Sequence, residues 1–144
     1  MIKSARSAVQ NLQSVSNKRG GLDTSGSPKL KPAIDVAFQL KEKKIPFKWG
    51  GKSERERFDS SGFAAYVLAR AGILTNPEKY WSGLLRETFK SVSSPSAGDL
   101  LFYDSGFVMI FLGNQTCIGM TPTGILTVPV DFGPKLLGKG KVNY

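Results

Sequence analysis

The chain has 144 residues, of which 40% are hydrophobic and 22% are charged, so it suits one globular domain with a sizeable core. One cysteine and no histidine exclude an internal disulfide and leave only carboxylates for a zinc site, so we expect no metal and no cofactor. No apolar run approaches the roughly 18–20 residues of a membrane span. The basic start lacks the apolar segment of a signal peptide, which predicts a protein made in the cytoplasm without a secretion address.

The net charge of +9 is concentrated at the two ends of the chain. We interpret residues 1–31 as a flexible basic N-terminal arm and residues 132–144 as a basic C-terminal tail, which leaves residues 32–131 as the domain. Their basic residues are either solvated or dock onto neighbouring protein subunits or a polyanion. Sequence-specific recognition of nucleic acid has no motif here. The candidate docking residues are Lys3, Arg6, Lys18, Arg19, Lys29, Lys31, Lys135, Lys139 and Lys141.

Three helices are expected in the first half of the domain. Residues 32–44 have apolar side chains at helical spacing. Residues 58–72 begin with a run of cap-forming residues and end at a glycine, which is typical of a complete helix. Residues 76–90 predict a third helix, and the phrase IPFKWGGK at 45–52 predicts an irregular turn between the first two.

The second half of the domain predicts strands. Short β-rich segments are separated by Gly, Asn, Asp or Thr-Pro, and they cover residues 100–103, 107–113, 116–120 and 125–130. Helices followed by an antiparallel meander indicate an α+β domain, in which the helices pack on one face of the sheet.

The segment FDSSGF at 58–63 raises the question of a nucleophile, because many enzymes hold one at a tight turn into a helix. Ser60 is the candidate, yet the chain has no histidine to act as its base. A Ser–Lys pair with Lys48 or Lys52 is an open alternative. A helix cap is the structural interpretation of the same segment.

Three other reactive side chains have structural interpretations. Cys117 is an alternative nucleophile, but a buried structural cysteine within a strand is far more common. Asp59 and Asp99 form a candidate carboxylate pair, and we interpret them instead as turn and cap residues.

Three stretches, supported by two shorter pieces, resemble the NlpC-type cell-wall peptidases, which are papain-like cysteine endopeptidases that cut the stem peptides of peptidoglycan. In chain order, the five segments are PFKWGG at 46–51, FDSSGF at 58–63, RAGI at 70–73, SAGDLLFY at 96–103 and GFVMIFLGN at 106–114. Their order and spacing match over residues 32–131. The resemblance implies a papain-like fold in which N-terminal helices pack on a C-terminal antiparallel β-meander.

The resemblance also implies where the active groups of the family would lie. The cysteine nucleophile falls at Ser60, the histidine at Phe107, and the residue that orients the histidine on or near Gly119. The tyrosine expected to help hold the oxyanion falls at Phe47, and a residue that is usually small falls at Met109. We interpret these positions as vestigial.

On this basis the chain is predicted to be no enzyme but a pseudoenzyme with a structural or binding role. It would be a subunit of a peptidoglycan-penetrating assembly, such as a phage tail or baseplate, and would be virion-associated. Its partners would be other subunits, bound through the basic arms, and peptidoglycan. Two alternatives stay open: an active hydrolase or amidase using Ser60 with an unrecognised base, and an adaptor that binds wall peptides without cutting them. The candidate groove residues are Trp49, Ser60, Met109, Tyr80 and Trp81.

Overall fold

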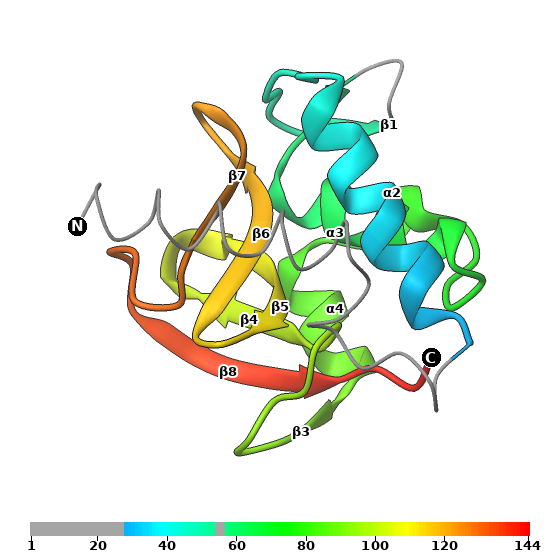
Figure 1. Cartoon of the computed structure of the whole chain (residues 1–144). Helices are drawn as coiled ribbons and strands as arrows, with labels where there is room; N and C mark the ends of the chain where they lie inside the picture. Colours follow the sequence, from blue (N-terminus) through cyan, green and yellow to red (C-terminus); the bar gives the residue numbers. More distant parts are fainter. Residues whose placement is uncertain (1–27, 54–56) are drawn as a thin grey trace.

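The computed structural model describes residues 28–53 and 57–144 (Figure 1). Its helices are α2 (Leu30–Glu42), α3 (Ser60–Arg70) and α4 (Ser82–Thr88), with 3-10 turns η1 (Pro77–Lys79) and η2 (Asp104–Gly106). The strands are β1 (Lys52–Ser53), β2 (Arg57–Phe58), β3 (Lys90–Ser91), β4 (Leu100–Tyr103), β5 (Val108–Gly113), β6 (Thr116–Thr121), β7 (Gly124–Pro129) and β8 (Leu136–Lys141). Among these helices, none is both long and apolar enough to cross a membrane.

Six strands form one antiparallel sheet in the order β3-β8-β4-β5-β6-β7, while β1 and β2 form a separate pair. Helix α3 packs on β5 and β6, and α2 packs on α3 and β7 (Figure 1). Strands β4 to β7 are the predicted meander. The predicted α+β fold, with its helices against an antiparallel sheet, is confirmed.

Strand β5 is buried on both faces, and it therefore gives the site a rigid support. Its alternate residues Val108, Ile110 and Leu112 belong to the main core shared with the helices. Met109 and Phe111 belong to a second apolar cluster with Leu101, Tyr103 and Cys117. The start of β5 is thus fixed by packing on both sides.

Two segments differ from the sequence predictions. Residues 76–90 are not one helix, because Tyr80 and Trp81 are extended (ψ 117° and 173°) and separate η1 from α4. Residues 132–144 are not a loose tail, because Leu136–Lys141 form β8, which pairs with both β3 and β4. The sequence of β8, LLGKGK, carries no local signal for a strand, and its pairing partners lie far away along the chain.

The proposed docking residues therefore have several different environments. Lys3, Arg6, Lys18 and Arg19 lie outside the described residues. At the start of α2, the Lys29 ammonium donates to the Gly72 carbonyl at 3.5 Å, and Lys31 pairs with Asp35 at 3.1 Å. Lys135 precedes β8, whereas Lys139 and Lys141 lie within it, and the Lys139 ammonium donates to the Ser93 carbonyl at 2.9 Å.

The residues that follow β8 are anchored to the turn before β4. Asp99 is 1% exposed, and its carboxylate accepts the N–H groups of Ser96 at 2.8 Å and Val142 at 3.0 Å. The Tyr144 hydroxyl donates to the Gly98 carbonyl at 2.6 Å. Asp99 therefore has the structural turn role that the sequence suggested, and it also holds residues beyond β8.

Candidate functional site

Asp59 fixes the start of helix α3. Its backbone is extended (φ −91°, ψ −175°), and its carboxylate accepts the Gly62 N–H at 2.6 Å, which is the geometry of a helix N-cap. The other carboxylate oxygen accepts the Gly50 N–H at 3.2 Å and lies 3.6 Å from the Lys52 ammonium. One side chain therefore holds the glycine turn and the first turn of α3 together.

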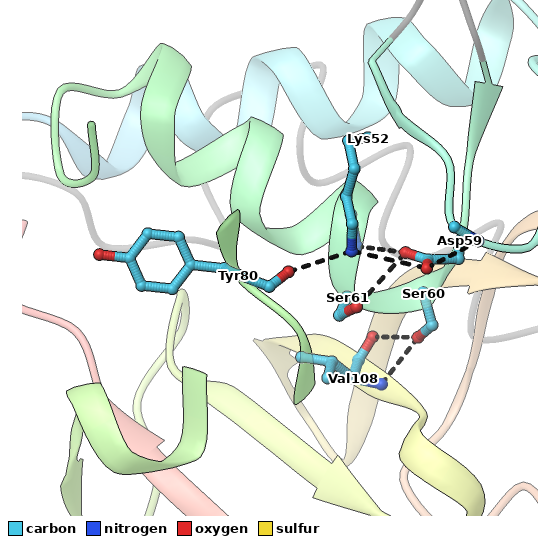
Figure 2. Close-up of polar contacts among 8 residues, drawn as sticks. Lys52, Asp59, Ser60, Ser61, Tyr80 and Val108 are labelled. Atoms are coloured by element: carbon cyan, nitrogen blue, oxygen red, sulfur yellow. Dashed lines mark hydrogen bonds and ion pairs between the residues drawn. The ribbon is translucent and has the colours of Figure 1, made fainter. Parts of the chain in front are cut away.

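The Ser60 hydroxyl is held by the first residue of β5 (Figure 2). Its oxygen accepts the Val108 N–H at 2.7 Å, and its hydrogen is donated to the Val108 carbonyl at 3.0 Å. Ser60 is 7% exposed, so both bonds are sheltered from water. Before Ser60 could attack a carbonyl, its donated hydrogen bond would have to be given up and a base would have to take the proton.

Lys52 points to groups other than Ser60. Its ammonium donates to the Tyr80 carbonyl at 3.1 Å and pairs with Asp59, as Figure 2 shows. Both side chains of that pair are largely buried, at 22% and 15% exposure, so their charges compensate each other locally. Within the described ranges, neither Lys48 nor Lys52 is hydrogen-bonded to Ser60.

A cleft of about 280 Å³ lies beside Ser60. Three of the five predicted groove residues, Trp49, Ser60 and Trp81, are brought together in it. The other two are not, because Tyr80 and Met109 are buried at 9% and 0% exposure and are absent from its walls. The full lining is Phe47, Trp49, Asp59, Ser60, Ser61, Trp81, Ser82, Ser105, Gly106, Phe107 and Pro122.

The position implied for the histidine holds the apolar ring of Phe107. The position implied for its orienting partner is Gly119, whose side-chain space is already occupied by Met109. Phe107 lines the cleft and packs edge-on against Phe132, with ring centroids 6.2 Å apart. A Cβ added to Gly119 would lie 2.4 Å from the Met109 sulfur. The thioether of Met109 therefore occupies the space that any side chain at position 119 would need.

Cys117 lies in the second apolar cluster and not in the cleft. Burial raises the pKa of its thiol to about 12, although a hydrogen bond with Tyr103 acts in the opposite direction. The Tyr103 hydroxyl lies 3.9 Å from the sulfur and donates to the Val130 carbonyl at 2.7 Å. The thiol is therefore protonated at neutral pH, and it does not supply the thiolate that nucleophilic catalysis needs.

Besides Ser61 on α3, four lining residues were not predicted from the sequence: Ser82, Ser105, Gly106 and Pro122. They come from the start of α4, from η2 and from the turn between β6 and β7. Ser105 and Gly106 have positive φ angles of 67° and 81°, so this turn is sharply bent. Turn-prone residues were visible in the sequence, but their meeting at one cleft depends on the tertiary fold.

The described residues offer no candidate metal centre, because no three Cys, His, Asp or Glu side chains gather among them. The cleft combines four aromatic rings with serine hydroxyls, and its one carboxylate, Asp59, is compensated by Lys52. An apolar pocket with a few polar groups is the usual form of a ligand-binding site.

The fold is thus an α+β domain in which a capped helix meets the start of a central antiparallel strand, with a cleft beside the junction. Comparison with protein-family models gives the family: the NlpC/P60 model matches residues 44–130, more than half of the chain. The chain belongs to the NlpC/P60 family, and the resemblance drawn from its motifs is confirmed.

Two of the similar proteins are named as probable endopeptidases. The chain is 35% identical over 103 residues to the probable peptidoglycan endopeptidase LytE of Bacillus subtilis, covering 65% of this chain and 29% of that protein. It is 34% identical over 103 residues to the probable endopeptidase p60 of Listeria seeligeri, covering 67% of this chain and 19% of that protein. A crystal structure from Staphylococcus aureus, of a protein described as similar to lipoprotein and as NLP/P60 family, has a similar fold, with a TM-score of 0.70 and 22% identity. The match covers 88% of this chain and 47% of that chain.

These comparisons correct one prediction. The residues at the implied catalytic positions predicted that the chain is no enzyme, and that prediction is wrong, because the relatives that the chain matches are named endopeptidases. The chain is a member of an enzyme family. It spans less than a third of the length of these two relatives.

Proposed function

We propose that this chain binds the stem peptides of peptidoglycan in the cleft at the start of α3. The observation that carries the proposal is the cleft itself, which lies where the capped helix meets β5 and is walled by aromatic rings. The names of the relatives support the same substrate class, since one of them is a probable peptidoglycan endopeptidase.

A second hollow supports an extended ligand. It measures about 310 Å³ and shares Phe47 and Pro122 with the cleft, so the two hollows are neighbours. Lys41 and Lys44 line this second part, and their ammonium groups suit the carboxylates of an acidic wall peptide. An extended ligand that passes over Phe47 and Pro122 would meet aromatic rings in the cleft and lysines in the second hollow.

The test is co-sedimentation with purified peptidoglycan sacculi. We expect the full chain to pellet with sacculi, and we expect Trp49→Ala and Trp81→Ala to weaken pelleting, because both rings are exposed in the cleft at 80% and 62%. Leu137→Ala is the matched control, since Leu137 is an exposed apolar residue on β8 and does not line the cleft. No pelleting, or equal loss in all three variants, would refute the proposal.

The same assay reports cleavage. If soluble stem-peptide fragments appear and Ser60→Ala abolishes them, Ser60 is the nucleophile despite its bonds to Val108. If fragments appear and survive Ser60→Ala, another group performs the reaction. If sacculi are bound but nothing is released, binding is the only function that the assay supports.

The place of the chain in a wall-penetrating assembly, such as a phage tail or baseplate, is a second candidate. It is supported by the basic residues near both ends of the sequence. The test is co-assembly with subunits encoded beside the gene, with and without residues 1–31. Assembly that does not depend on those residues would contradict a docking role for them.

A further inference from the structure

The two tryptophans of the chain are its most exposed large apolar side chains in the described ranges, and both line the same cleft. Trp49 is 80% exposed and Trp81 is 62% exposed. Large aromatic side chains normally bury most of their surface, so two exposed indoles in one cleft indicate a ligand that covers them.

Both rings are held by contacts that leave an aromatic surface open. Trp49 packs edge-on against Phe47, with centroids 5.3 Å apart and an interplanar angle of 83°. Trp81 lies against the backbone of α4 at Gly83, where an added Cβ would fall within 3 Å of three indole carbons. Because these contacts are made before any ligand arrives, little ordering cost would remain on binding.

The polar groups of the cleft are nearly all neutral. Besides the rings it presents serine hydroxyls, and within the described residues the hydroxyls of Ser82 and Ser105 make no hydrogen bond, although the Ser105 N–H donates to Asp104. The single carboxylate, Asp59, is occupied by the N–H groups of Gly50 and Gly62 and by Lys52. The cleft therefore suits an uncharged ligand group that has an apolar face for the indoles and hydrogen-bonding groups for the serines.

We propose that the aromatic half of the cleft binds a pyranose ring of the wall glycan, so that the ligand is a sugar-linked peptide and not the peptide alone. A pyranose has C–H groups on its faces, which pack on indoles, and hydroxyl or amide groups on its rim, which meet serines. This inference rests on the proposed function, because the peptide attached to the sugar would continue past Phe47 toward Lys41 and Lys44.

The experiment compares three soluble probes on the full chain: a muropeptide of disaccharide and stem peptide, the same stem peptide without sugar, and the disaccharide alone. Affinity is measured by intrinsic tryptophan fluorescence, because both tryptophans lie in the cleft and a bound ligand would change their emission. We expect the muropeptide to bind about tenfold more tightly than the bare peptide. Trp49→Ala should remove most of this preference, so that its affinities for the muropeptide and for the bare peptide become nearly equal. Calorimetry replaces fluorescence for the tryptophan variants.

Gly83→Ala tests the fixed ring without deleting it. The new methyl group would displace the Trp81 indole, so we expect the sugar preference to fall. Because alanine is a better helix former than glycine, α4 and the fold should be kept. Leu137→Ala serves again as the control and should retain the full preference.

The outcomes separate the two proposals. Equal affinity for muropeptide and bare peptide overturns the sugar inference and leaves stem-peptide binding intact. Binding of the disaccharide with no contribution from the peptide supports the sugar inference and overturns the proposed function. No binding of any probe overturns both, and a full sugar preference in Trp49→Ala and Gly83→Ala places the sugar elsewhere and overturns the inference.

Discussion

The hydroxyl of Ser60 bridges the N–H and the carbonyl of Val108, and it thereby joins the first turn of α3 to the first residue of β5. These residues are 48 positions apart in the sequence. The bridge sets the distance between helix and strand at the point where the cleft opens. Ser60 therefore has a structural role in this fold, whatever chemistry the cleft supports.

Loss of this bridge should be measurable as lost stability. Ser60→Ala leaves a buried N–H and a buried carbonyl without their side-chain partner, and we expect it to lower the free energy of unfolding by about 1–3 kcal/mol. Ser94→Ala removes an exposed hydroxyl and is the control. Urea denaturation of both variants checks this, and equal midpoints would show that the bridge contributes nothing.

Met109 and Gly119 should behave as a coupled pair. Gly119→Ala places a methyl group 2.4 Å from the Met109 sulfur in a site with no exposed surface, so we expect a loss of about 1–3 kcal/mol from overpacking. Combined with Met109→Ala, the same substitution should cost much less. A double-mutant cycle measures the coupling, and strictly additive effects would mean that the two side chains do not compete for this space.

Asp99 should anchor the residues beyond β8. Asp99→Ala removes a buried carboxylate that accepts two N–H groups, and a loss of about 3 kcal/mol or more is expected from hydrogen bonds to a charged group. Asp99→Asn keeps the shape and one good acceptor, so its loss should be intermediate. Thermal unfolding of the three proteins gives the order, and an unchanged midpoint in Asp99→Ala would refute the anchor.

The alkaline stability of the protein should depend on Cys117. Burial raises the pKa of its thiol from 9.0 to about 12, so the folded state keeps a proton that the unfolded chain releases. This contribution is fully present below about pH 9 and is lost as the pH rises toward about 12. Burial also raises the pKa of Tyr103 and of Tyr144, which act in the same direction.

The check is the free energy of unfolding of wild type and Cys117→Ala from about pH 8 to about pH 11. The absolute values will differ, because the sulfur also fills space, so the slopes are compared. The wild type should lose stability with pH more steeply than the variant. Parallel slopes would mean that the thiol titrates equally in the folded and unfolded chains.

The cap of α3 and the meander were predictable because their signals are local. Asp59 before an apolar helical run predicted the start of α3, and alternating β-rich segments between turn residues predicted β4 to β7. Strand β8 was not predictable in this way. Its glycines pack beneath Phe102 and Arg86, and these contacts exist only after distant strands have paired.

The site was predictable only in part, for the same reason. Motif order located Ser60 and Trp49, and Trp81 was predicted as a groove residue because it is aromatic. Tyr80 belongs to the core instead, because the extended backbone at 80–81 sends neighbouring side chains in opposite directions. Met109 points away from the helices because alternate residues of β5 face opposite sides of the sheet. Its thioether fills the space beside Gly119, and this pairing across strands was not visible in the sequence.

The central claim is that peptidoglycan stem peptides bind in the cleft, and the two indole N–H signals in an NMR titration test it most directly. Both tryptophans line the cleft, so soluble muropeptide should shift both signals saturably, together with the backbone signals of Ser61 and Ser82. If both indole signals stay in place while the ligand shifts signals on β8 or elsewhere, or if nothing shifts, the claim is contradicted.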